Sequence, residues 1–392
     1  MSRERAYLRS HPFITFRVGW QQADPQVWML LGEAQSKCEH IARTPLLPEV
    51  REELDKLYLT KGLSATTAIE GNTLTEEEVR RRIEGQLELP PSREYLGQEV
   101  DNIHRAVGRI PELIGEHGST RVTPEIICEY NLLVLEGLDL PDEVQPGRVR
   151  GHEVVVGQYV LAPAQDCAFL LERLCEWINS PDEWPQGLDA ISEALLKAIL
   201  AHLYLAWIHP FGDGNGRTAR LLEVHLLAGA GVNRSAAHLL SNHYNQTRSR
   251  YYEQLDRARR ARHRGPLEFL RYALQGLVDG MKEQLSWIRA QLDILIWQQF
   301  VEARFHNLRG SVPARRRAVV LALCGRDAAT AAEIRRLSPE VAGRYGDKHP
   351  RTIARDLAFL EQKNLIVKTE DGKWRPNLEL LERLLPPRTV GR

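Results

Sequence analysis

The pattern of apolar and polar positions along this chain predicts a mainly α-helical protein. Apolar residues recur every three or four positions over most of its length, which places them on one face of a helix. Proline and glycine punctuate these segments and indicate where helices begin and end. We expect helices at Pro25–Ile41, Glu49–Thr60, Tyr95–Ile114, Thr123–Leu135, Leu170–Ile178, Leu188–Ile208, Leu221–Ala230 and Pro266–Arg304.

The helical period gives way to strand-like runs near the middle of the chain. Val154–Val156 and Tyr159–Leu161 flank the dipeptide Gly157–Gln158, an arrangement typical of a β-hairpin. A short strand is also expected at Phe13–Val18, within an otherwise irregular N-terminal stretch. The sequence therefore predicts little sheet in this part of the protein.

Length and composition bound the class of protein. A chain of 392 residues is too long for one typical core, so two or three domains are expected. The formal net charge is zero, with 43% hydrophobic and 27% charged residues, which favours neither nucleic acid nor a membrane as the partner of the whole chain. The five cysteines lack the spacing of a metal site and fit the reducing cytoplasm. The most apolar run, Ala194–Phe211, includes Lys197, which argues against a membrane span.

Residues 311–392 differ in charge from the rest. They contain 17 Lys and Arg against 10 Asp and Glu, a net charge of +7, so the remainder carries −7. Helical patterns at Arg315–Leu323 and Ala331–Leu337, and a third around His349–Leu360, precede two short strands that flank the turn Glu370–Gly372. Three helices followed by a hairpin resemble a winged helix.

In the winged-helix interpretation, Thr352–Leu360 is the recognition helix. Arg351 and Arg355 would reach a groove of DNA, and Lys373 or Arg375 would reach a phosphate. A surface that docks a protein is the alternative. The charge excess is modest, so the sequence leaves DNA binding and protein docking equally open.

A glycine-rich stretch, His209–Arg220, lies between two of the most apolar helical segments. Gly212, Gly214 and Gly216 alternate through it, which disfavours a helix interior and suits close approach of the backbone to another molecule. The free N–H groups and positive dipole at the start of the following helix make an anion site at Gly214, Asn215 and Gly216.

Four side chains of this stretch add chemistry to the anion site. Arg217 and Arg220 lie three positions apart, on one face of the first helical turn, and suit a polyphosphate. Asp213 is a carboxylate of the kind that holds a phosphate-bound Mg²⁺. His209 supplies a base that titrates near neutral pH. Each residue alone is more often structural, but their combination in one short stretch points to nucleotide chemistry.

The stretch resembles, without a mismatch, the signature His-x-Phe-x-Asp/Glu-Gly-Asn-Gly-Arg-x-x-Arg of the Fic (filamentation induced by cAMP) family. The resemblance implies a helical catalytic domain that moves AMP from ATP onto a protein hydroxyl. It makes His209 the base, Asp213 the Mg²⁺ ligand and Phe211 a buried anchor, with Arg217 and Arg220 clamping the β- and γ-phosphates. The nucleotide-binding loop that it implies comprises Phe211, Gly212, Asp213, Gly214, Asn215, Gly216, Arg217 and Arg220.

An inhibitory segment is expected upstream of this loop. Glu70 stands in the last turn of a helix, where the helix dipole disfavours a carboxylate. Its surroundings resemble the family's inhibitory motif Ser/Thr-x-x-x-Glu-Gly/Asn, which implies that Glu70 pairs with Arg220 and keeps it from the γ-phosphate. Holding about 99% of the protein in that state requires about 2.7 kcal/mol. The residues of this segment are Thr66, Glu70, Gly71 and Asn72.

The predicted hairpin resembles the family's flap, which positions the target side chain over the loop. Its residues are Val155, Val156, Gly157 and Gln158. An exposed hairpin edge suits pairing with an extended segment of another protein. A plain surface hairpin is the alternative.

Tyr251 and Tyr252 resemble a family segment that lines the nucleotide pocket near the adenine. Aromatic faces suit a flat base, and packing at the domain edge is the alternative. Arg259 stands where many relatives have asparagine, so the preference for adenine stays open.

We expect four regions: an N-terminal helical region with the inhibitory motif at 1–100, a Fic catalytic domain at 101–265, a helical linker at 266–310 and a winged-helix-like domain at 311–392. The fold class is therefore mainly α, with a β-hairpin flap and a C-terminal winged helix. The linker also offers a surface for a homodimer.

The leading functional hypothesis is an autoinhibited cytoplasmic adenylyltransferase. It would use ATP and Mg²⁺ to modify a Ser, Thr or Tyr hydroxyl of a protein, including its own. Alternatively, the same site removes AMP, with Glu70 orienting a water, or transfers a different group such as UMP or phosphate. A third alternative is a DNA-binding regulator that only senses ATP, although sensing needs no base such as His209.

Overall fold

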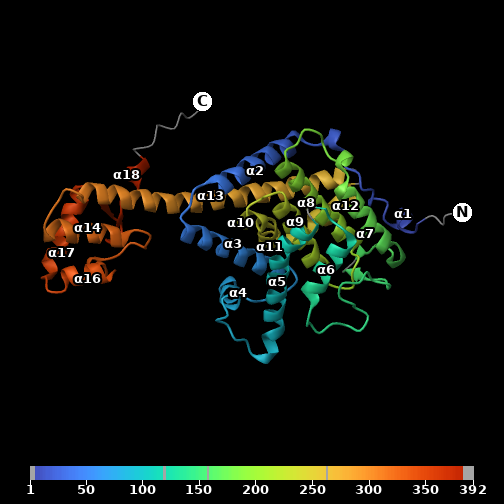
Figure 1. The fold of residues 1–392 in the computed structure, drawn as a ribbon, viewed down its shortest axis with the longest axis horizontal. Helices are drawn as coiled ribbons and strands as arrows, with labels where there is room; N and C mark the ends of the chain where they lie inside the picture. Colours follow the sequence, from blue (N-terminus) through green and yellow to red (C-terminus); the bar gives the residue numbers. More distant parts are fainter. Residues whose placement is uncertain (1–4, 118–120, 157–158, 262–263, 383–392) are drawn as a thin grey trace. The chain divides into compact units, whose positions relative to one another are not determined.

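The computed structural model describes residues 5–117, 121–156, 159–261 and 264–382. The chain forms two compact units, Met1–Glu283 and Gln284–Arg392. The N-terminal region and the catalytic domain expected from the sequence both lie in the first unit. Helices dominate each unit, as the sequence predicts (Figure 1).

The first unit is built from helices of very different length. Its helices are α1 (Tyr7–Ser10), α2 (Pro25–Arg43), α3 (Pro48–Ile69), α4 (Glu76–Ile83), α5 (Glu94–His117), α6 (Pro124–Leu135), α7 (Ala164–Asn179), α8 (Ala190–Ile208), α9 (Asn215–Gly229), α10 (Arg234–Ala237), α11 (Leu239–Gln246), α12 (Arg248–Arg260) and the first part of α13 (Gly265–Phe305). Short 3₁₀ turns occur at Trp20–Gln22, Pro91–Arg93 and Pro181–Glu183. The strands β1 (Val155–Val156) and β2 (Tyr159–Val160) form an antiparallel pair.

Local sequence signals mark the starts of several helices. Asp24 caps α2 and is followed by proline at the first helical position. Thr75 and Glu78 form a reciprocal capping box at the start of α4. Thr123 caps α6, which also starts with proline. These signals are local, so they can be read without knowing the tertiary structure.

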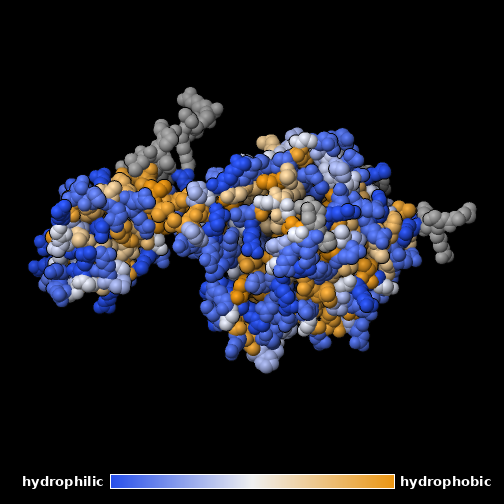
Figure 2. Space-filling view, viewed as in Figure 1, coloured by the Kyte–Doolittle hydropathy of each residue, from blue (hydrophilic) through white to orange (hydrophobic). Residues whose placement is uncertain are grey.

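Helices α8 and α9 pack against each other at the centre of the first unit (Figure 1). Most residues of both helices are buried. Among the described residues, α8 is the one helix long and apolar enough to cross a membrane, but 78% of its apolar window is buried inside the protein. Hydrophilic side chains dominate the visible surface of the unit (Figure 2). The burial of α8 is therefore that of a core helix.

Helix α3 continues to Ile69, beyond the Thr60 end that the apolar pattern predicts. The added turns bury small and polar residues, including Gly62, Ser64 and Thr67. A Cβ atom at Gly62 would lie 2.6 Å from the ring of His238, so glycine allows the close approach. Because small residues fill this interface, the apolar periodicity fades there although the helix continues.

The predicted strand at Phe13–Val18 is wrong. The segment has the alternating burial of a strand, with Ile14 and Phe16 buried, but forms no strand. Phe16 adopts a φ of 51° and stacks on Tyr204 of α8 at 5.1 Å between ring centroids. The segment is therefore held by aromatic packing against a helix, because it has no partner strand.

The second unit begins within α13. Its remaining elements are α14 (Ser311–Leu323), α15 (Ala331–Ile334), α16 (Pro339–Tyr345), α17 (Pro350–Gln362), β3 (Ile366–Lys368), β4 (Trp374–Pro376) and α18 (Glu379–Glu382). The antiparallel pair β3–β4 aligns Val367 with Arg375. The predicted helices and hairpin are present in the predicted order, with α16 added between the second and third predicted helices.

A separate core supports the second unit. Trp297 of α13, Val319 of α14 and Leu357 of α17 belong to one buried cluster. Asp356, also on α17, is buried and forms ion pairs of 2.6 and 2.7 Å with Arg315 and Arg316. This unit therefore holds its helices with its own apolar and charged contacts.

Candidate active site

The loop between α8 and α9 turns on two residues with left-handed backbone. His209 ends α8 with a φ of 52°, and its N–H donates to Leu205 O at 2.8 Å. Gly214 caps α9 with a φ of 75°. A positive φ is a strained choice for histidine and an ordinary one for glycine. The strain at His209 is a feature of the kind that clusters at functional sites.

Asn215 and Phe211 close the loop. The Phe211 N–H donates to Asn215 Oδ1 at 3.0 Å, and Asn215 Nδ2 donates to Phe211 O at 2.9 Å. The Phe211 side chain is fully buried, which fits its predicted place as an anchor. The Asn215 side chain therefore fixes the loop, while its backbone belongs to the start of α9.

Two residues that the sequence reasoning missed hold the loop from outside. Asn131 of α6 donates to Asp213 O at 2.8 Å. The buried Arg150 donates through Nε to His209 O at 2.9 Å and through Nη1 to His152 O at 2.8 Å. A further Arg150 bond, from Nη2, reaches Ala162 O. Because His152 and Ala162 lie on either side of the hairpin, Arg150 ties the hairpin to the α8–α9 loop.

The sequence reasoning assumed that His209 titrates near neutral pH, but its pKa in the structure is well below that. Burial and the positive charge of Arg150 lower the pKa of His209 to about 4, although Glu70 and Asp213 act in the opposite direction. The imidazole is therefore neutral at physiological pH and can accept a proton. Its side chain lines a pocket of about 260 Å³.

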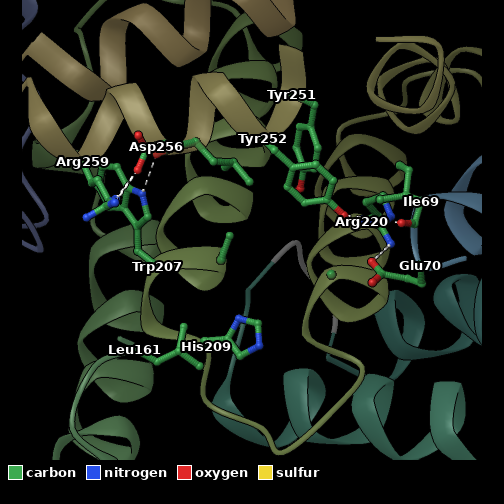
Figure 3. Close-up of a pocket in the computed structure, with 13 residues that line it drawn as sticks. Ile69, Glu70, Leu161, Trp207, His209, Arg220, Tyr251, Tyr252, Asp256 and Arg259 are labelled. Carbon is green, nitrogen blue, oxygen red and sulfur yellow. Dashed lines mark hydrogen bonds and ion pairs between the residues drawn. The ribbon is translucent and has the colours of Figure 1, made fainter. Parts of the chain in front are cut away.

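This pocket lies beside the loop and the start of α9 (Figure 3). Its lining residues are Ile69, Glu70, Leu161, Ala206, Trp207, His209, Gly216, Arg220, Tyr251, Tyr252, Leu255, Asp256 and Arg259. The volume is slightly below the range of roughly 300–1,000 Å³ common for small-molecule sites. The pocket brings together the predicted base, one predicted phosphate clamp, the glutamate predicted to inhibit and both predicted tyrosines.

The two tyrosines contribute differently to the pocket. Tyr251 is buried, and its hydroxyl hydrogen-bonds His202 Nε2 at 2.8 Å. Tyr252 is exposed, and its hydroxyl donates to Ile69 O at 3.4 Å. Arg259 lies at the end of the pocket opposite Glu70 and Arg220 and pairs with Asp256, with Nε at 2.7 Å from Oδ1 (Figure 3). Tyr252 is thus the more accessible aromatic face for a ligand.

Glu70 and Arg220 form the contact that the sequence resemblance implies. Arg220 Nη2 donates to Glu70 Oε1 at 2.6 Å and to Thr66 O at 3.0 Å. Burial acts to raise the pKa of Glu70, but the charge and hydrogen bond of Arg220 outweigh it and hold that pKa below its usual value. Gly216 makes room for the pair, because a Cβ atom there would lie 2.2 Å from Glu70 Oε1.

Arg220 is nonetheless only partly satisfied. Its side chain is 1% exposed, and within the described part of the chain Nε and Nη1 have no hydrogen-bond partner. Buried guanidinium donors without partners are costly unless an acceptor reaches them. They mark the start of α9 as a place for an anion.

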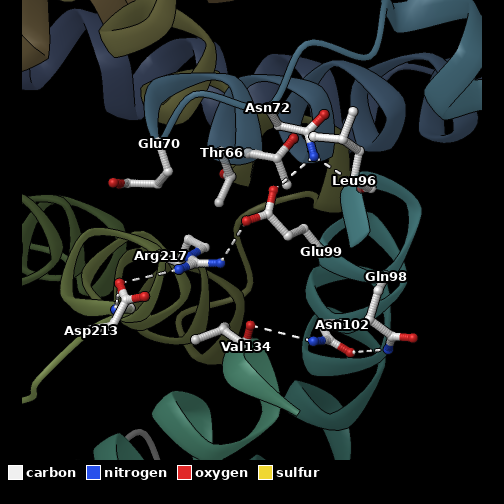
Figure 4. Close-up of polar contacts among 12 residues, drawn as sticks. Thr66, Glu70, Asn72, Leu96, Gln98, Glu99, Asn102, Val134, Asp213 and Arg217 are labelled. Carbon is white, nitrogen blue, oxygen red and sulfur yellow. Dashed lines mark hydrogen bonds and ion pairs between the residues drawn. The ribbon is translucent and has the colours of Figure 1, made fainter. Parts of the chain in front are cut away.

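Arg217, the second predicted clamp, is also held by carboxylates (Figure 4). It lies 3.3 Å from Glu99 Oε1 of α5 and 3.3 Å from Asp213 Oδ1. Asn72 Nδ2 donates to the other Glu99 oxygen, Oε2, at 2.8 Å and to Leu96 O at 2.9 Å. The segment after Glu70 is therefore connected to both arginines, and Glu99 is a site residue that the sequence reasoning missed.

Gly71 follows the end of α3. Gly71 has a φ of 106°, which is a left-handed value that favours glycine after a helix. The predicted hairpin is also present, with Val155 paired to Val160 and Val156 to Tyr159. Gly157 and Gln158 lie outside the described residues, so the flap role stays a prediction.

Asp213 is the one predicted metal ligand. Its carboxylate is 48% exposed beside Arg217. The described residues contain no group of three or more His, Cys, Asp and Glu side chains that could hold a metal ion. The donor set therefore fits a cation that is shared with phosphate oxygens rather than one held by protein alone.

Comparison with known proteins agrees with this geometry. Residues 121–227 match the Fic/DOC family. The chain is 28% identical over 199 residues to protein adenylyltransferase fic-1 of Caenorhabditis elegans, covering 51% of this chain and 37% of that protein. It is 30% identical over 214 residues to protein adenylyltransferase Fic of Nematostella vectensis, covering 55% of this chain and 46% of that protein. The chain thus spans less than half of these relatives.

Solved structures extend the similarity of fold over most of the chain. A Fic family protein from Desulfovibrio desulfuricans G20 superposes with a TM-score of 0.55 at 22% identity, covering 90% of this chain and 96% of that one. The Fic-1 structure from Caenorhabditis elegans gives a TM-score of 0.52 at 24% identity, covering 67% and 73%. With its motif loop between α8 and α9 and the match over residues 121–227, this chain carries a Fic domain.

Proposed function

We propose that this protein transfers AMP from ATP to a hydroxyl group of a protein. The observation that carries the proposal is the α8–α9 loop, which gathers His209, Asp213, Arg217 and Arg220 at the start of α9. The relatives named protein adenylyltransferases support the same reaction. The target hydroxyl oxygen bonds to the α-phosphorus, the bond from that phosphorus to the bridging oxygen breaks, and pyrophosphate leaves.

His209 would take the hydroxyl proton. Its low pKa keeps the imidazole neutral, so it is ready to accept a proton at physiological pH. The bond from Arg150 to His209 O holds the residue at the end of α8. A base in a fixed position lowers the entropic cost of reaching the reactive geometry.

The start of α9 would bind the phosphates. The first N–H groups of a helix have no intrahelical partner and favour negative charge. The unpaired Nε and Nη1 of the buried Arg220 and the guanidinium of Arg217 add positive charge. Asp213 would hold Mg²⁺, which would neutralise the phosphates when bound. These groups would stabilise the charge that develops on pyrophosphate.

Glu70 would restrain the reaction. The 2.6 Å bond to Glu70 occupies Arg220 Nη2, and the same carboxylate lies against Gly216. A γ-phosphate would have to displace this carboxylate to pair with Arg220. Because the pair is partly buried, a charge-assisted hydrogen bond of about 1.5–3 kcal/mol is enough to keep most molecules restrained.

Intact mass spectrometry tests the proposal. The wild type, Glu70→Gly and the double variant Glu70→Gly/His209→Ala are incubated with ATP and Mg²⁺. Glu84→Gly is the matched control, because Glu84 also ends a helix beside an arginine, at 3.1 Å from Arg80, but lies outside the pocket. We expect Glu70→Gly to gain AMP, and the double variant and Glu84→Gly to stay as unmodified as the wild type.

Two other reactions remain in competition. Removal of AMP, with Glu70 orienting a water, would appear as release of AMP from a modified target by the wild type and its loss in Glu70→Gly. Transfer of another nucleotide stays open because Arg259, which stands where many relatives have asparagine, lines one end of the pocket. Competition of GTP, UTP and CTP with ATP in Glu70→Gly measures that preference. Lack of any AMP gain in Glu70→Gly, with or without cell extract as target source, would contradict AMP transfer.

For the second unit we propose a winged helix that binds DNA. Arg351, Ala354, Arg355 and Ala358 form an exposed stripe along α17, where small residues permit close approach to a groove. A gel shift by the full chain that weakens steeply with added salt supports this. Binding to a protein or a second copy with no shift of duplex DNA would favour docking instead.

The five free cysteines support our proposal of a cytoplasmic location.

A further inference from the structure

A second pocket lies at the other end of α3 from Glu70. Its volume is about 520 Å³, within the roughly 300–1,000 Å³ of small-molecule sites. It is formed by residues of α3 and α5, by Arg234 of α10 and by His238 directly after α10. Those residues are Pro48, Arg51, Glu52, Asp55, Lys56, Leu59, His104, Val107, Gly108, Arg234 and His238. None of them belongs to the catalytic pocket.

The charges of this second pocket favour an anion. Lys56 and Glu52 pair with each other at 3.5 Å. Burial lowers the pKa of His104, and burial and then Arg234 lower that of His238 to about 4, so both rings are neutral at physiological pH. Arg51 and Arg234 therefore remain as two positive charges with Asp55 as the single negative charge.

Asp55 offers a carboxylate oxygen that a hydrogen-bond donor of a ligand could reach. Its Oδ1 atom is buried and has no hydrogen-bond partner in the described part of the chain. Burial raises the pKa of Asp55, and the charges of Arg51 and Arg234 oppose this, although neither arginine forms an ion pair with it within 4.0 Å among those residues. A ligand that meets every group would carry an anionic group for the arginines and a hydroxyl or amine for Asp55.

Helix α3 connects the second pocket to the inhibitory contact. Asp55, Leu59, Gly62, Thr66 and Ile69 follow one face of the helix, because they are spaced by three or four positions. The first two line the second pocket, and Ile69 lines the catalytic pocket. Thr66 O accepts the hydrogen bond from Arg220 described above. One helix face therefore touches both sites.

The middle of that helix face packs directly against a residue that lines the second pocket. His238 lines the pocket and packs on Gly62 so closely that a Cβ atom there would lie 2.6 Å from its ring. From Gly62 to Glu70 the helix rises by about 12 Å at roughly 1.5 Å per residue. A shift of α3 against His238 would therefore move the residue that holds Arg220.

We propose that the pocket of Arg51, Asp55 and Arg234 binds a small phosphorylated metabolite with free hydroxyl groups, and that this ligand strengthens the hold of Glu70 on Arg220. The effect on activity rests on the proposed function, whereas the binding site does not. This second pocket is open in the conformation in which Arg220 is hydrogen-bonded to Glu70. A ligand that binds this conformation in preference to others stabilises it.

Calorimetry on the full chain tests the site. Ribose 5-phosphate is the probe, and inorganic phosphate tests binding of the anionic group without the hydroxyl groups. Arg51→Ala and Arg234→Ala remove the two guanidinium groups in turn. Arg43→Ala is the matched control, because Arg43 is a largely exposed arginine at the end of α2. We expect ribose 5-phosphate to bind the wild type and Arg43→Ala alike, and each pocket variant about tenfold or more weakly.

Amide hydrogen exchange tests the coupling without any AMP transfer. On addition of ribose 5-phosphate without ATP, exchange at residues 66–72 should slow about fivefold or more in the wild type and Arg43→Ala, and stay unchanged in Arg234→Ala. No binding of ribose 5-phosphate, or equal binding by all four proteins, would overturn the site. Binding with unchanged exchange would overturn the coupling. Neither readout depends on catalysis, so failure of AMP transfer is distinguishable from failure of this proposal.

Discussion

Replacing Glu70 by glutamine separates the effect of charge from the effect of shape in the contact with Arg220 that we propose to be inhibitory. Glutamine keeps the length of the side chain and an oxygen that can accept from Arg220 Nη2, now 2.6 Å from Glu70 Oε1. The Arg220 guanidinium stays charged, so its hydrogen bond to glutamine remains charge-assisted, and the variant loses only the attraction between two opposite charges, about 1 kcal/mol or less for an exposed ion pair. The Glu70 side chain is 31% exposed, so solvent screens part of its charge.

A loss of about 1 kcal/mol changes an equilibrium about fivefold. Starting from about 1% of molecules released, glutamine should release about a twentieth of them, whereas Glu70→Gly should release nearly all. The initial rate of AMP incorporation at saturating ATP should therefore rise about fivefold in Glu70→Gln and about a hundredfold in Glu70→Gly. Glu84→Gln is the control and should match the wild type.

The order of the two variants' rates of AMP incorporation decides the test. If Glu70→Gln stays at the wild-type rate while Glu70→Gly rises, bulk beside Gly216 restrains the enzyme and charge does not. If both variants reach the same rate, charge accounts for the whole restraint. If neither variant rises, the reasoning from the Glu70–Arg220 pair is wrong.

Three further predictions follow from other contacts. Gly62→Ala should raise AMP transfer and lower the melting temperature, because a Cβ atom 2.6 Å from His238 forces α3 to shift and overpacking costs about 1–3 kcal/mol; an unchanged rate would show that α3 absorbs the clash without moving Glu70. Arg150→Ala should raise the pKa of His209 from about 4, since its positive charge is removed, as NMR titration of the imidazole would detect, and should slow transfer by Glu70→Gly. Stability should fall as pH drops from about 6.5 towards 4, by about 1.4 kcal/mol per pH unit for each of His209 and His238, because the unfolded chain binds protons there first; urea unfolding at pH 7 and pH 5 measures the slope, and equal midpoints would contradict the low pKa values.

The parts of the site that depend on neighbouring residues could be predicted from the sequence. The α8–α9 loop is predictable because its chemistry lies within one short stretch, and Thr75 and Thr123 mark helix starts through neighbours only a few positions away. The contact between Glu70 and Arg220 spans 150 positions, yet a family resemblance reveals it. Spacing alone would not have joined these two residues.

The parts that were missed depend on tertiary contacts. Arg150 sits in a turn-rich stretch where an arginine is usually solvated, and only the fold places it against His209 O. Glu99 lies on a predicted helix, but its partners Asn72 and Arg217 come from two other elements. Phe13–Val18 alternates like a strand, although a strand needs a partner that this segment lacks.

The contacts of Asn72 indicate that the proposed restraint would act through the end of α3 as a whole and not through one hydrogen bond. It follows the end of α3 by a few positions, binds the Leu96 carbonyl and Glu99 of α5, and so reaches Arg217 through Glu99. Glu70 reaches Arg220 from the same end of α3. A displacement of this end would loosen both arginines together, whereas a change at either arginine alone would leave the other held. Because helices move as rigid pieces between discrete packings, the phosphate clamps would be released together, and control of α3 anywhere along its length is control of both.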